Sequence, residues 1–299
     1  MGASSGGYRC RVAAIRDATP ADFDAAFELL DTRSRAAFGV SEEKQEFLRQ
    51  RWALPGYDKW VAIEDGAVIG YAALDEDQEF AHTAADATVG DELLAHVEHQ
   101  ARVRGFRQLS ATTVPEDVPF SAVLQRGGYH LDREVLRMWR TLDGPLPEPV
   151  WTDGVAVRSY TDADGERVHA LLDATYAAWD DGYVARSHEG WLSFMTLHSD
   201  FDPEMWFLVE RDEELVACAL HWRAHQGRGW VKDIVVREHE RGHGLGKALI
   251  HHAFREYAAR GVERVGLKVD STNPTGAPQL YERLGFVTDQ RLGIWTKSL

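Results

Sequence analysis

The stretch RGHGLGKALIHHAFREY, residues 241–257, directly follows the apolar run GWVKDIVVREHE, residues 229–240. Gly242, Gly244 and Gly246 stand at alternate positions where a strand pattern gives way to a helix pattern. The first N–H groups of a helix have no intrahelical partner, and the helix dipole adds partial positive charge there. Glycines let the chain turn with positive φ and let a bulky anion approach the backbone. The stretch therefore predicts an anion site of the kind that binds phosphate.

The glycine spacing differs from that of two familiar phosphate loops. The dinucleotide fingerprint needs Gly-x-Gly-x-x-Gly, and the P-loop ends in Gly-Lys-Ser/Thr. Neither order occurs here. Arg241 and Lys247 can add positive charge at the rim of the predicted site. A glycine-rich turn that serves packing alone is the alternative interpretation.

The 299-residue chain also repeats itself. Three segments match in the same order: 15–31 with 157–173, 59–74 with 205–220, and 124–129 with 281–286. Each copy predicts a short strand, an amphipathic helix, and then two strands joined by a polar turn. Three matches in one order make chance an unconvincing explanation, so we expect two copies of one α/β unit.

The expected boundaries follow from a Pro-rich segment, DGPLPEPVWTDG, residues 143–154, which reads as a linker. We expect a disordered tail over 1–11, a degenerate domain over 12–143, a linker over 144–154 and a second domain over 155–299. In each domain we expect a central mixed, mostly antiparallel sheet flanked by helices.

The two copies differ at the glycines. The shared Arg-Gly of VRGF and ARGV places AADATVG, residues 84–90, under ERGHGLG, residues 240–246, so that only Gly90 keeps its glycine. The replacements are Ala85 for Arg241, Asp86 for Gly242, Thr88 for Gly244 and Leu124 for Tyr281. We therefore expect the anion site only in the second copy.

Composition and net charge narrow the classes of binding partner that we expect. With 44% hydrophobic and 27% charged residues the chain is expected to be globular. Its net charge of −15 argues against nucleic acid or an anionic membrane and suits an amine-bearing substrate better. No apolar run approaches the roughly 20 residues of a membrane span, and MGASSGGYRC lacks the apolar core of a signal peptide. We expect a cytoplasmic monomer or homodimer.

Metal binding is not expected. Cys10 and Cys218 lie far apart in the sequence and form no ligand motif. Four histidines lie within one segment, but only two pairs of them could approach each other, and no third ligand accompanies either pair. These residues are His239, His243, His251 and His252.

Residues 155–299 resemble the GNAT superfamily of acyl-CoA-dependent N-acyltransferases. Arg241, Gly244 and Gly246 match the family pattern Arg/Gln-x-x-Gly-x-Gly/Ala at the end of its fourth strand. The resemblance implies that backbone amides of this loop hold the pyrophosphate of coenzyme A. It also implies that the preceding strand, 233–236, splays from its neighbour and lays the pantetheine and thioester against its exposed backbone.

A second stretch, VDSTNPTGAPQLYERLGFV, residues 269–287, follows the family's later segment. The matching residues are Asn273, Ala277, Leu280, Tyr281, Gly285 and Phe286, with Asn273 one residue further from Ala277 than usual. The two-copy layout resembles that of tandem GNAT proteins of the mycothiol synthase type. The resemblance implies acetyl-CoA as co-substrate. The residues it implies in coenzyme binding are Ile234, Val235, Val236, Arg241, Gly242, His243, Gly244, Leu245, Gly246, Lys247, Asn273, Ala277 and Tyr281.

Acyl transfer from a thioester to an amine needs a proton for the leaving thiolate, and Tyr281 suits this role. A phenol has a reference pKa of about 10 and is a neutral donor at pH 7, so it can act as general acid. The matching tyrosine has this role in the family. A backbone N–H at Val235 or Val236 would polarise the carbonyl. Packing of Tyr281 on the core is the alternative.

The general base is less well defined. Asp233, at the acyl end of the coenzyme strand, is the first candidate. Many GNAT relatives carry a Glu upstream on this strand, where Trp230 and Lys232 stand here. His221 and His225, on the adjoining predicted strand, are rivals with nearly neutral pKa. A structural role for Asp233 and a water relay without a dedicated base are further alternatives.

The acceptor site is expected between the first helix and the second strand of this copy, over residues 177–203. Aromatic and acidic residues together suit an ammonium-bearing small molecule, although the aromatics could equally build the core. They are Trp179, Tyr183, Trp191 and Phe194 with Asp180, Asp181 and Glu189.

The favoured function is an acetyl-CoA-dependent N-acetyltransferase that transfers acetyl to the primary amine of a small molecule by direct attack on the thioester. Acetylation of a protein N-terminus or lysine is one alternative, and a non-catalytic acyl-CoA-binding sensor is another. A nucleotide-binding regulatory domain would need a ribose-binding acid about 20 residues after the glycines, for which Asp270 is the candidate. That alternative leaves LYERLGF unexplained.

Overall fold

The computed structural model describes residues 13–39, 45–54, 56–76, 79–178, 183, 185–196, 200–225 and 228–299. The tail expected over 1–11 lies outside the described residues. The chain forms two compact units. The first takes in the residues up to Trp52, Gly56–His130 and Trp295–Leu299, and the second takes in Ala53–Pro55 and Leu131–Ile294.

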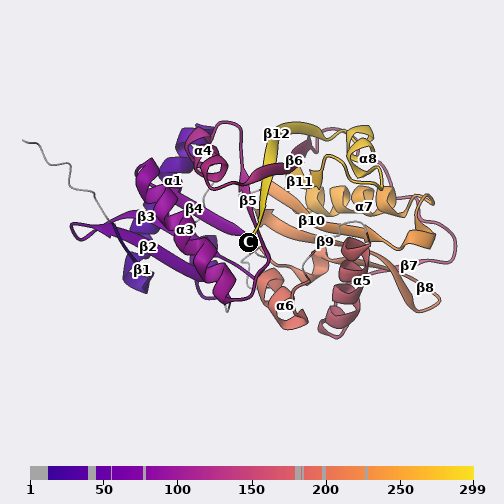
Figure 1. Cartoon of the computed structure of the whole chain (residues 1–299). Helices are drawn as coiled ribbons and strands as arrows, with labels where there is room; N and C mark the ends of the chain where they lie inside the picture. Colours follow the sequence, from indigo (N-terminus) through magenta and orange to yellow (C-terminus); the bar gives the residue numbers. More distant parts are fainter. Residues whose placement is uncertain are drawn as a thin grey trace, which may run out of the picture. The chain divides into compact units, whose positions relative to one another are not determined.

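The first unit contains a four-stranded antiparallel sheet in the order β1-β2-β3-β4 (Figure 1). Helices α3 and α4 bury their apolar faces against it, with Leu93, Val97 and Leu124 among the fully buried side chains. The elements are β1 (Ala14–Asp17), α1 (Phe23–Phe38), α2 (Gln45–Trp52), β2 (Asp58–Glu64), β3 (Ala67–Leu74), β4 (Phe80–Ala84), α3 (Ala87–Val103), β5 (Gln108–Thr113) and α4 (Val118–Arg126).

The second unit is built on strands in the order β12-β6-β11-β10-β9-β8-β7. The β10–β11 ladder is parallel, whereas β6–β11, β9–β10, β8–β9 and β7–β8 are antiparallel. The elements are β6 (His130–Thr141), β7 (Ala156–Ser159), α5 (Gly165–Ala177), α6 (His188–Thr196), β8 (Phe207–Arg211), β9 (Glu214–His225), β10 (Arg228–Val236), α7 (Leu245–Ala259), β11 (Arg264–Asp270), α8 (Ala277–Arg283) and β12 (Val287–Ser298). The expected mostly antiparallel sheets flanked by helices are confirmed, and the sheet of the second unit is mixed.

The sheet of the second unit separates two apolar layers, because successive side chains of a strand point to opposite faces. On one face Leu249 and Phe254 of α7 pack with Leu267 of β11. On the other face Leu172 of α5 and Met195 of α6 pack with Val235 of β10. Residues of the strand β10 therefore contribute to both layers, Val231 to the first and Val235 to the second.

The repeat seen in the sequence is matched by the same hydrogen-bond arrangement near the first helix of each unit. In the first unit Arg16 donates to both oxygens of Asp22, which also accepts from the Thr19 backbone and hydroxyl. In the second unit Arg158, Asp164 and Thr161 form the same arrangement, with the same donors and distances of 2.7–2.9 Å. The arginine hydrogen bonds hold the pKa of both aspartates well below the usual range. Such charge-assisted contacts fix the entry of each copy's first helix.

Strand β6 belongs to the first copy by sequence but to the second unit by packing. It pairs with β11 from Val135↔Asp270 to Thr141↔Arg264, and its Leu136 and Met138 are buried in the α7-side core. Conversely, Trp295–Leu299 belong to the first unit. The boundaries of the compact units therefore differ from the boundaries expected at 143 and 155. The expected boundaries describe the repeat in the sequence and stay a prediction. Repeat order assigns a strand to a copy, whereas pairing assigns it to a sheet.

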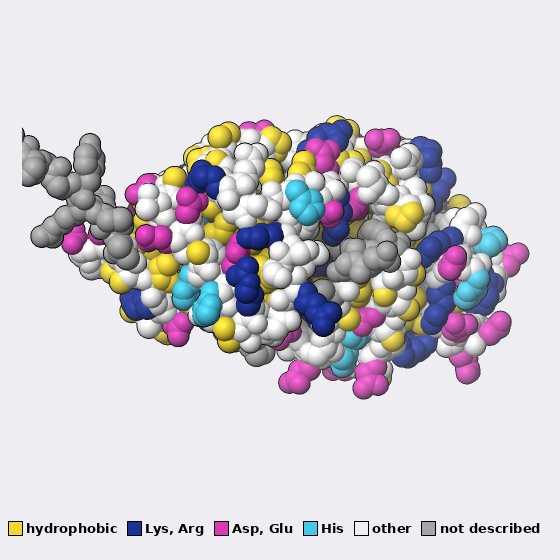
Figure 2. Space-filling view, in the orientation of Figure 1, with side chains coloured by type: hydrophobic (Ala, Val, Ile, Leu, Met, Phe, Trp, Pro, Cys, Tyr) yellow, Lys and Arg dark blue, Asp and Glu magenta, His cyan; other side chains and the backbone are white. Residues whose placement is uncertain are grey.

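The surface carries charges of both signs. Figure 2 shows acidic side chains interspersed with lysines and arginines over the visible face. None of the helices within the described parts of the chain has the length and apolar character needed to cross a membrane.

We expect a fragment of residues 144–299 to fold poorly, whereas a fragment of residues 131–299 regains a cooperative core. The shorter fragment lacks Leu136 and Met138, and losing buried side chains of this size costs about 2–5 kcal/mol each, against a typical total of about 5–15 kcal/mol. Thermal unfolding followed by near-ultraviolet circular dichroism measures the difference. Equal, cooperative transitions in both fragments would contradict the role given to β6.

Candidate functional site

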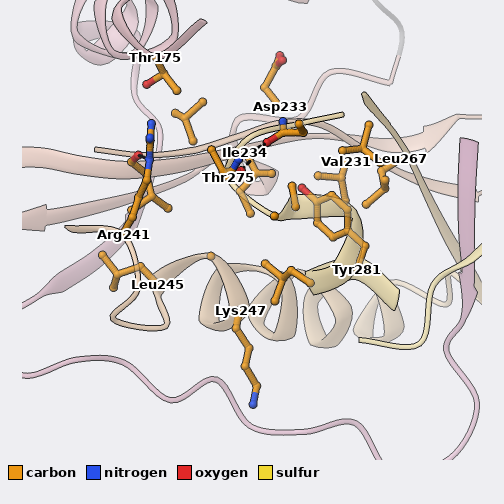
Figure 3. Close-up of a pocket in the computed structure, with 18 of the residues that line it drawn as sticks. Thr175, Val231, Asp233, Ile234, Arg241, Leu245, Lys247, Leu267, Thr275 and Tyr281 are labelled. Carbon is orange, nitrogen blue, oxygen red and sulfur yellow. Dashed lines mark hydrogen bonds between the residues drawn. The ribbon is translucent and has the colours of Figure 1, made fainter. Parts of the chain in front are cut away.

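A cavity of about 490 Å³ lies in the second unit, where β10 and β11 end and α7 and α8 begin (Figure 3). Both strands, the glycine-rich loop and the loop before α8 line it, and α5 contributes Thr175 and Tyr176. The cavity thus gathers the two motifs that the sequence analysis singled out about 35 residues apart.

The cavity exists because β10 and β11 pair over only part of their length and then diverge. Their ladder runs only from Gly229↔Val265 to Val231↔Leu267, although β10 continues to Val236 and β11 to Asp270. Strand backbone without a neighbour leaves N–H and C=O groups that a ligand can bind. This is the splay that the resemblance implied.

A β-bulge at Lys232 determines to which face of the sheet Asp233, the first candidate for the general base, points. Val231 pairs with His221 of β9, but Asp233 pairs with the next residue, Leu220, so Lys232 is the extra residue. Val231 therefore faces the α7 layer, whereas Val235 packs in the α5 layer. Asp233, two residues before Val235, lies on the same α5 side.

The loop geometry explains two of the three glycines. Gly242 has φ +80° and Gly244 has φ +90°, a region that other residues rarely adopt. A Cβ at either position would meet no protein atom within 4 Å, so the backbone is open to a ligand there. Gly244 is the N-cap of α7, and the following N–H groups have no intrahelical acceptor. Gly246 lies within the helix, and a Cβ there would make only ordinary contacts.

The structure brings most of the residues expected to bind coenzyme to this cavity. Of that set, only His243 does not line it; this residue is exposed. Arg241 Nε donates to the Val236 carbonyl at 3.0 Å, which holds the arginine at the end of β10. In Figure 3 the Lys247 side chain points away from the strands, so its backbone rather than its ammonium faces the site. The Asn273 Oδ1 accepts from the Thr275 backbone and hydroxyl, which shapes the loop before α8.

Tyr281 projects from α8 towards the parted strands. Its side chain is buried, and its ring packs edge-on against Phe286 at 5.7 Å. In Figure 3 the hydroxyl points to β10. Burial, and then the negative charge of Asp233, raises the pKa of this phenol. Tyr281 is therefore a neutral donor at physiological pH.

Asp233 has a partner that the sequence analysis missed. The Tyr176 hydroxyl, from the last turn of α5, donates to Asp233 Oδ1 at 2.6 Å. Burial raises the pKa of Tyr176 well above its ordinary value, so the phenol stays protonated. Val168, Leu172 and Tyr176 recur at i, i+4 and i+8, which places Tyr176 on the buried face of α5. Spacing could reveal that face but not its partner on a strand 57 residues away.

His221, one of the two rival bases, is not brought to the cavity. His221 is fully buried between Phe207 and Tyr257 on the α7 side of the sheet and does not line the cavity. Burial lowers the pKa of His221 to about 3. The side chain of His225 lies outside the described residues. Trp230, at one of the positions where many relatives carry Glu, packs edge-on against Trp139.

The expected acceptor segment is only partly described, because Trp179, Asp180 and Asp181 lie outside the described residues. Trp191 is a core residue of the α5 side, and Phe194 packs against that core, as the packing alternative anticipated. The Tyr183 hydroxyl donates to Asp173 at 2.5 Å. Glu189 is exposed on α6.

In the first unit an arginine binds the backbone of the strand that corresponds to β10 in the repeat. Arg33 of α1 donates to the His82 carbonyl in β4 and to Asp117 at 2.5 Å, and its guanidinium lies over the Phe120 ring. A Cβ on Gly90 would lie 3.0 Å from Val123. The strand β4 therefore has its backbone bound by an arginine, whereas β10 of the second unit borders a cavity.

The acid required by the alternative of a nucleotide-binding domain has partners within the chain. Asp270, the candidate ribose-binding acid, accepts from Thr272 and forms an ion pair with Arg133 at 3.1 Å. Within the described residues, no group of three or more His, Cys, Asp or Glu side chains is arranged to hold a metal ion.

Comparison with known proteins agrees with this geometry. A model of the acetyltransferase (GNAT) family matches residues 166–286. Mycothiol acetyltransferase from Streptomyces bingchenggensis is 30% identical over 93% of this chain and 94% of its own; that from Kineococcus radiotolerans is 33% identical over 88% and 89%. The chain belongs to the GNAT acetyltransferase family. It is an N-acetyltransferase, as the sequence predicted.

Solved structures resemble this GNAT chain over both units. A GCN5-related N-acetyltransferase from Sphaerobacter thermophilus has a TM-score of 0.75 at 25% identity, over 96% of this chain and 95% of its own. A tandem GNAT protein from the clavulanic acid biosynthesis pathway has a TM-score of 0.71 at 18% identity, over 96% and 98%, and shares the fold. The tandem arrangement is thus confirmed.

We expect Gly244→Trp to abolish binding of coenzyme A, because the indole would fill the open space beside the first N–H groups of α7. Gly261→Trp is the matched control, since Gly261 has φ +73° and a Cβ there also meets no atom within 4 Å. Calorimetry should give one coenzyme per chain for the unmodified protein and the control. Two equivalent sites, or unchanged affinity in Gly244→Trp, would contradict the loop assignment.

Proposed function

We propose that this GNAT protein transfers the acetyl group of acetyl-CoA to the primary amine of a small molecule, by direct attack of the amine on the thioester. The observation that carries the proposal is the single cavity that joins the glycine loop, the Tyr176–Asp233 pair and Tyr281. An anion site, a carboxylate and a neutral phenol are the three parts that such a transfer needs.

The coenzyme would run from the loop to the apex of the splay. Its pyrophosphate would bind the N–H groups at the start of α7. The Arg241 guanidinium, which donates to the Val236 carbonyl, would lie beside it. Its pantetheine would follow the unpaired edge of β10 over Ile234–Val236. A backbone N–H at Val235 or Val236 would then polarise the thioester carbonyl.

The reaction would proceed in one displacement. The amine nitrogen attacks the carbonyl carbon, and the carbon–sulfur bond breaks as the thiolate leaves. Tyr281 donates its proton to the sulfur, and the nitrogen loses its proton towards Asp233. A carboxylate is too weak a base to deprotonate a free ammonium, so Asp233 would hold the amine and take its proton as the carbon–nitrogen bond forms. Tyr176 would fix the carboxylate rotamer.

The cavity has the size of a small-molecule site, and the acceptor in this proposal is a small amine. At about 490 Å³ it falls within the ~300–1,000 Å³ typical of small-molecule sites. The relatives named mycothiol acetyltransferase support the same class of acceptor. Acetylation of a protein N-terminus or lysine stays the alternative, and a panel of small amines against peptides separates the two. A cytoplasmic location is part of the proposal, because a small amine and acetyl-CoA would meet there.

Tyr281→Phe should lower kcat by about 100-fold, the typical contribution of a positioned general acid, while the affinity for acetyl-CoA is retained. Release of the free thiol measures turnover. Tyr257→Phe is the control for loss of a buried hydroxyl, because the Tyr257 hydroxyl bonds to strand backbone at Trp222 and Trp230. A rate equal to that of the unmodified enzyme would remove the role of Tyr281.

Tyr176→Phe should lower kcat/KM for the amine by about 10–100-fold, because a hydrogen bond to a charged group contributes about 1.5–3 kcal/mol. Asp233→Asn should cost at least as much. If the two residues act as one unit, the double variant loses little more than Asp233→Asn alone. Additive losses in this cycle would show that Tyr176 acts independently of Asp233.

A further inference from the structure

A buried acidic side chain borders the proposed phosphate site. Glu240 directly precedes Arg241, lines the cavity together with Gly242 and Gly244, and is only 8% exposed. The N–H groups at the start of α7 attract an anion such as the pyrophosphate of coenzyme A, whereas a negative charge in the same wall repels it. In a partly buried site one unit charge acting over about 10 Å can change the affinity about 10-fold. The site therefore depends on what neutralises Glu240.

Arg211, the last residue of β8, forms an ion pair with this carboxylate. Its Nε lies 2.8 Å from Glu240 Oε1, and its Nη2 lies 3.3 Å from Oε2, so that the arginine binds both oxygens. Only 30% of the Arg211 side chain and 11% of the Glu240 side chain are exposed. A bidentate contact of this kind is stronger than a single hydrogen bond, and burial limits its screening by salt. Arg211 does not itself line the cavity, so we expect it to act on the site through Glu240.

The segment before β7 holds the Arg211 guanidinium in place. Nη1 donates to the Asp153 carbonyl at 2.7 Å, and Nη2 donates to Thr152 Oγ1 at 3.2 Å. Gly154 follows with φ +76°, and a Cβ there would lie 3.2 Å from Nη1. These three residues belong to the Pro-rich segment 143–154, which the sequence analysis interpreted only as a linker. The segment thus orients the arginine towards its carboxylate partner before any coenzyme binds.

The backbone around Glu240 keeps this residue at the site. Glu240 ends a 3-10 turn, Glu238–Glu240, in which its N–H donates to the Arg237 carbonyl at 3.0 Å. If the charge of Arg211 were removed, the turn would still hold Glu240 in the cavity wall, buried and without its ion-pair partner. Arg241 would thus meet the phosphates inside the cavity, whereas Arg211 cancels an opposing charge from outside it.

The first copy of the repeat lacks both members of this pair, as it lacks two of the three loop glycines. The ungapped repeat alignment places Asp65 opposite Arg211 and Ala84 opposite Glu240. The arginine and aspartate near each first helix, by contrast, are present in both copies. The Arg211–Glu240 pair therefore accompanies the glycine loop and not the shared scaffold, which associates it with the coenzyme site.

We propose that Arg211 is a positioning residue for the coenzyme, which holds and neutralises Glu240 so that the phosphates can bind beside it. This inference rests on the proposed function and adds a residue to its coenzyme site. It assigns part of the affinity for acetyl-CoA to a contact outside the cavity, while Tyr281 and Asp233 keep their roles in the chemistry.

Arg211→Gln should raise the Kd of coenzyme A about 10-fold, because it leaves the Glu240 carboxylate beside the phosphates without its cation. The KM for acetyl-CoA should rise in parallel, whereas kcat and the KM for the amine change little. Arg211→Lys keeps the charge but not the planar fork, and it should retain most of the affinity. Calorimetry measures Kd, and release of free thiol measures kcat and KM.

A second substitution tests whether Arg211 acts through Glu240. Glu240→Gln removes the opposing charge and should not weaken binding of coenzyme A. In the Glu240→Gln background, Arg211→Gln should then change Kd by no more than about 2-fold. An undiminished loss in that background would show that Arg211 acts through another contact, and would overturn the inference.

Arg167→Gln is the matched control, because Arg167 also binds the β8–β9 hairpin through one carboxylate and one carbonyl. It lies 2.9 Å from Glu210 Oε1 and donates to the Glu213 carbonyl at 3.0 Å. This variant should leave Kd unchanged. An equal rise of Kd in Arg167→Gln would assign the effect to the hairpin as a whole, and would overturn the inference.

The outcomes separate the inference from the proposed function. Failure of the unmodified protein to bind coenzyme A refutes the proposed function and the inference with it. Binding and turnover with equal Kd in Arg211→Gln overturn the inference alone. If Arg211→Gln does not fold, as thermal unfolding would show, Arg211→Lys and Glu240→Gln decide. A Kd at or below that of the unmodified protein in both supports the inference, and a Kd raised about 10-fold in both overturns it.

Discussion

The end of the β10–β11 ladder at Val231 and Leu267 is the constraint on which the site depends. Up to that pair the sheet is continuous, and beyond it two strands run on without each other. The bulge at Lys232 sits at the same level and turns Asp233 to the α5 face, where Tyr176 can reach it. Because the bulge sits where the ladder ends, the carboxylate and the unpaired backbone share one cavity.

The two units share one scaffold but differ around the strand that borders the cavity in the second unit. The Arg–Asp–Thr arrangement at each first helix is the same to within about 0.2 Å in its hydrogen bonds. In the first unit, however, the strand β4 is bound by Arg33, and Gly90 is backed by Val123. The start of the first helix is thus the same in both units, whereas the surroundings of the strand and of the glycine differ.

Much of this could be predicted from sequence, because the deciding residues act locally. Positive φ at Gly242 and Gly244, the helix that follows them and the position of Tyr281 depend on short stretches of chain. The partnership of Tyr176 with Asp233 could not be predicted, since it depends on which turn of α5 meets which residue of β10. The bulge at Lys232 and the pairing of β6 with β11 are properties of ladders, and one chain read alone does not reveal its register.

The placement of Asp233 also couples the acceptor to the acid. Burial is the first cause of the raised pKa of Tyr281, and the Asp233 charge is the second. A raised pKa makes the phenol a poorer proton donor, which works against protonation of the leaving thiolate. In the proposed reaction Asp233 takes a proton from the amine as the carbon–nitrogen bond forms, which neutralises the carboxylate and removes the second cause. Tyr281 would therefore become the stronger acid at the stage of the proposed reaction where the thiolate leaves.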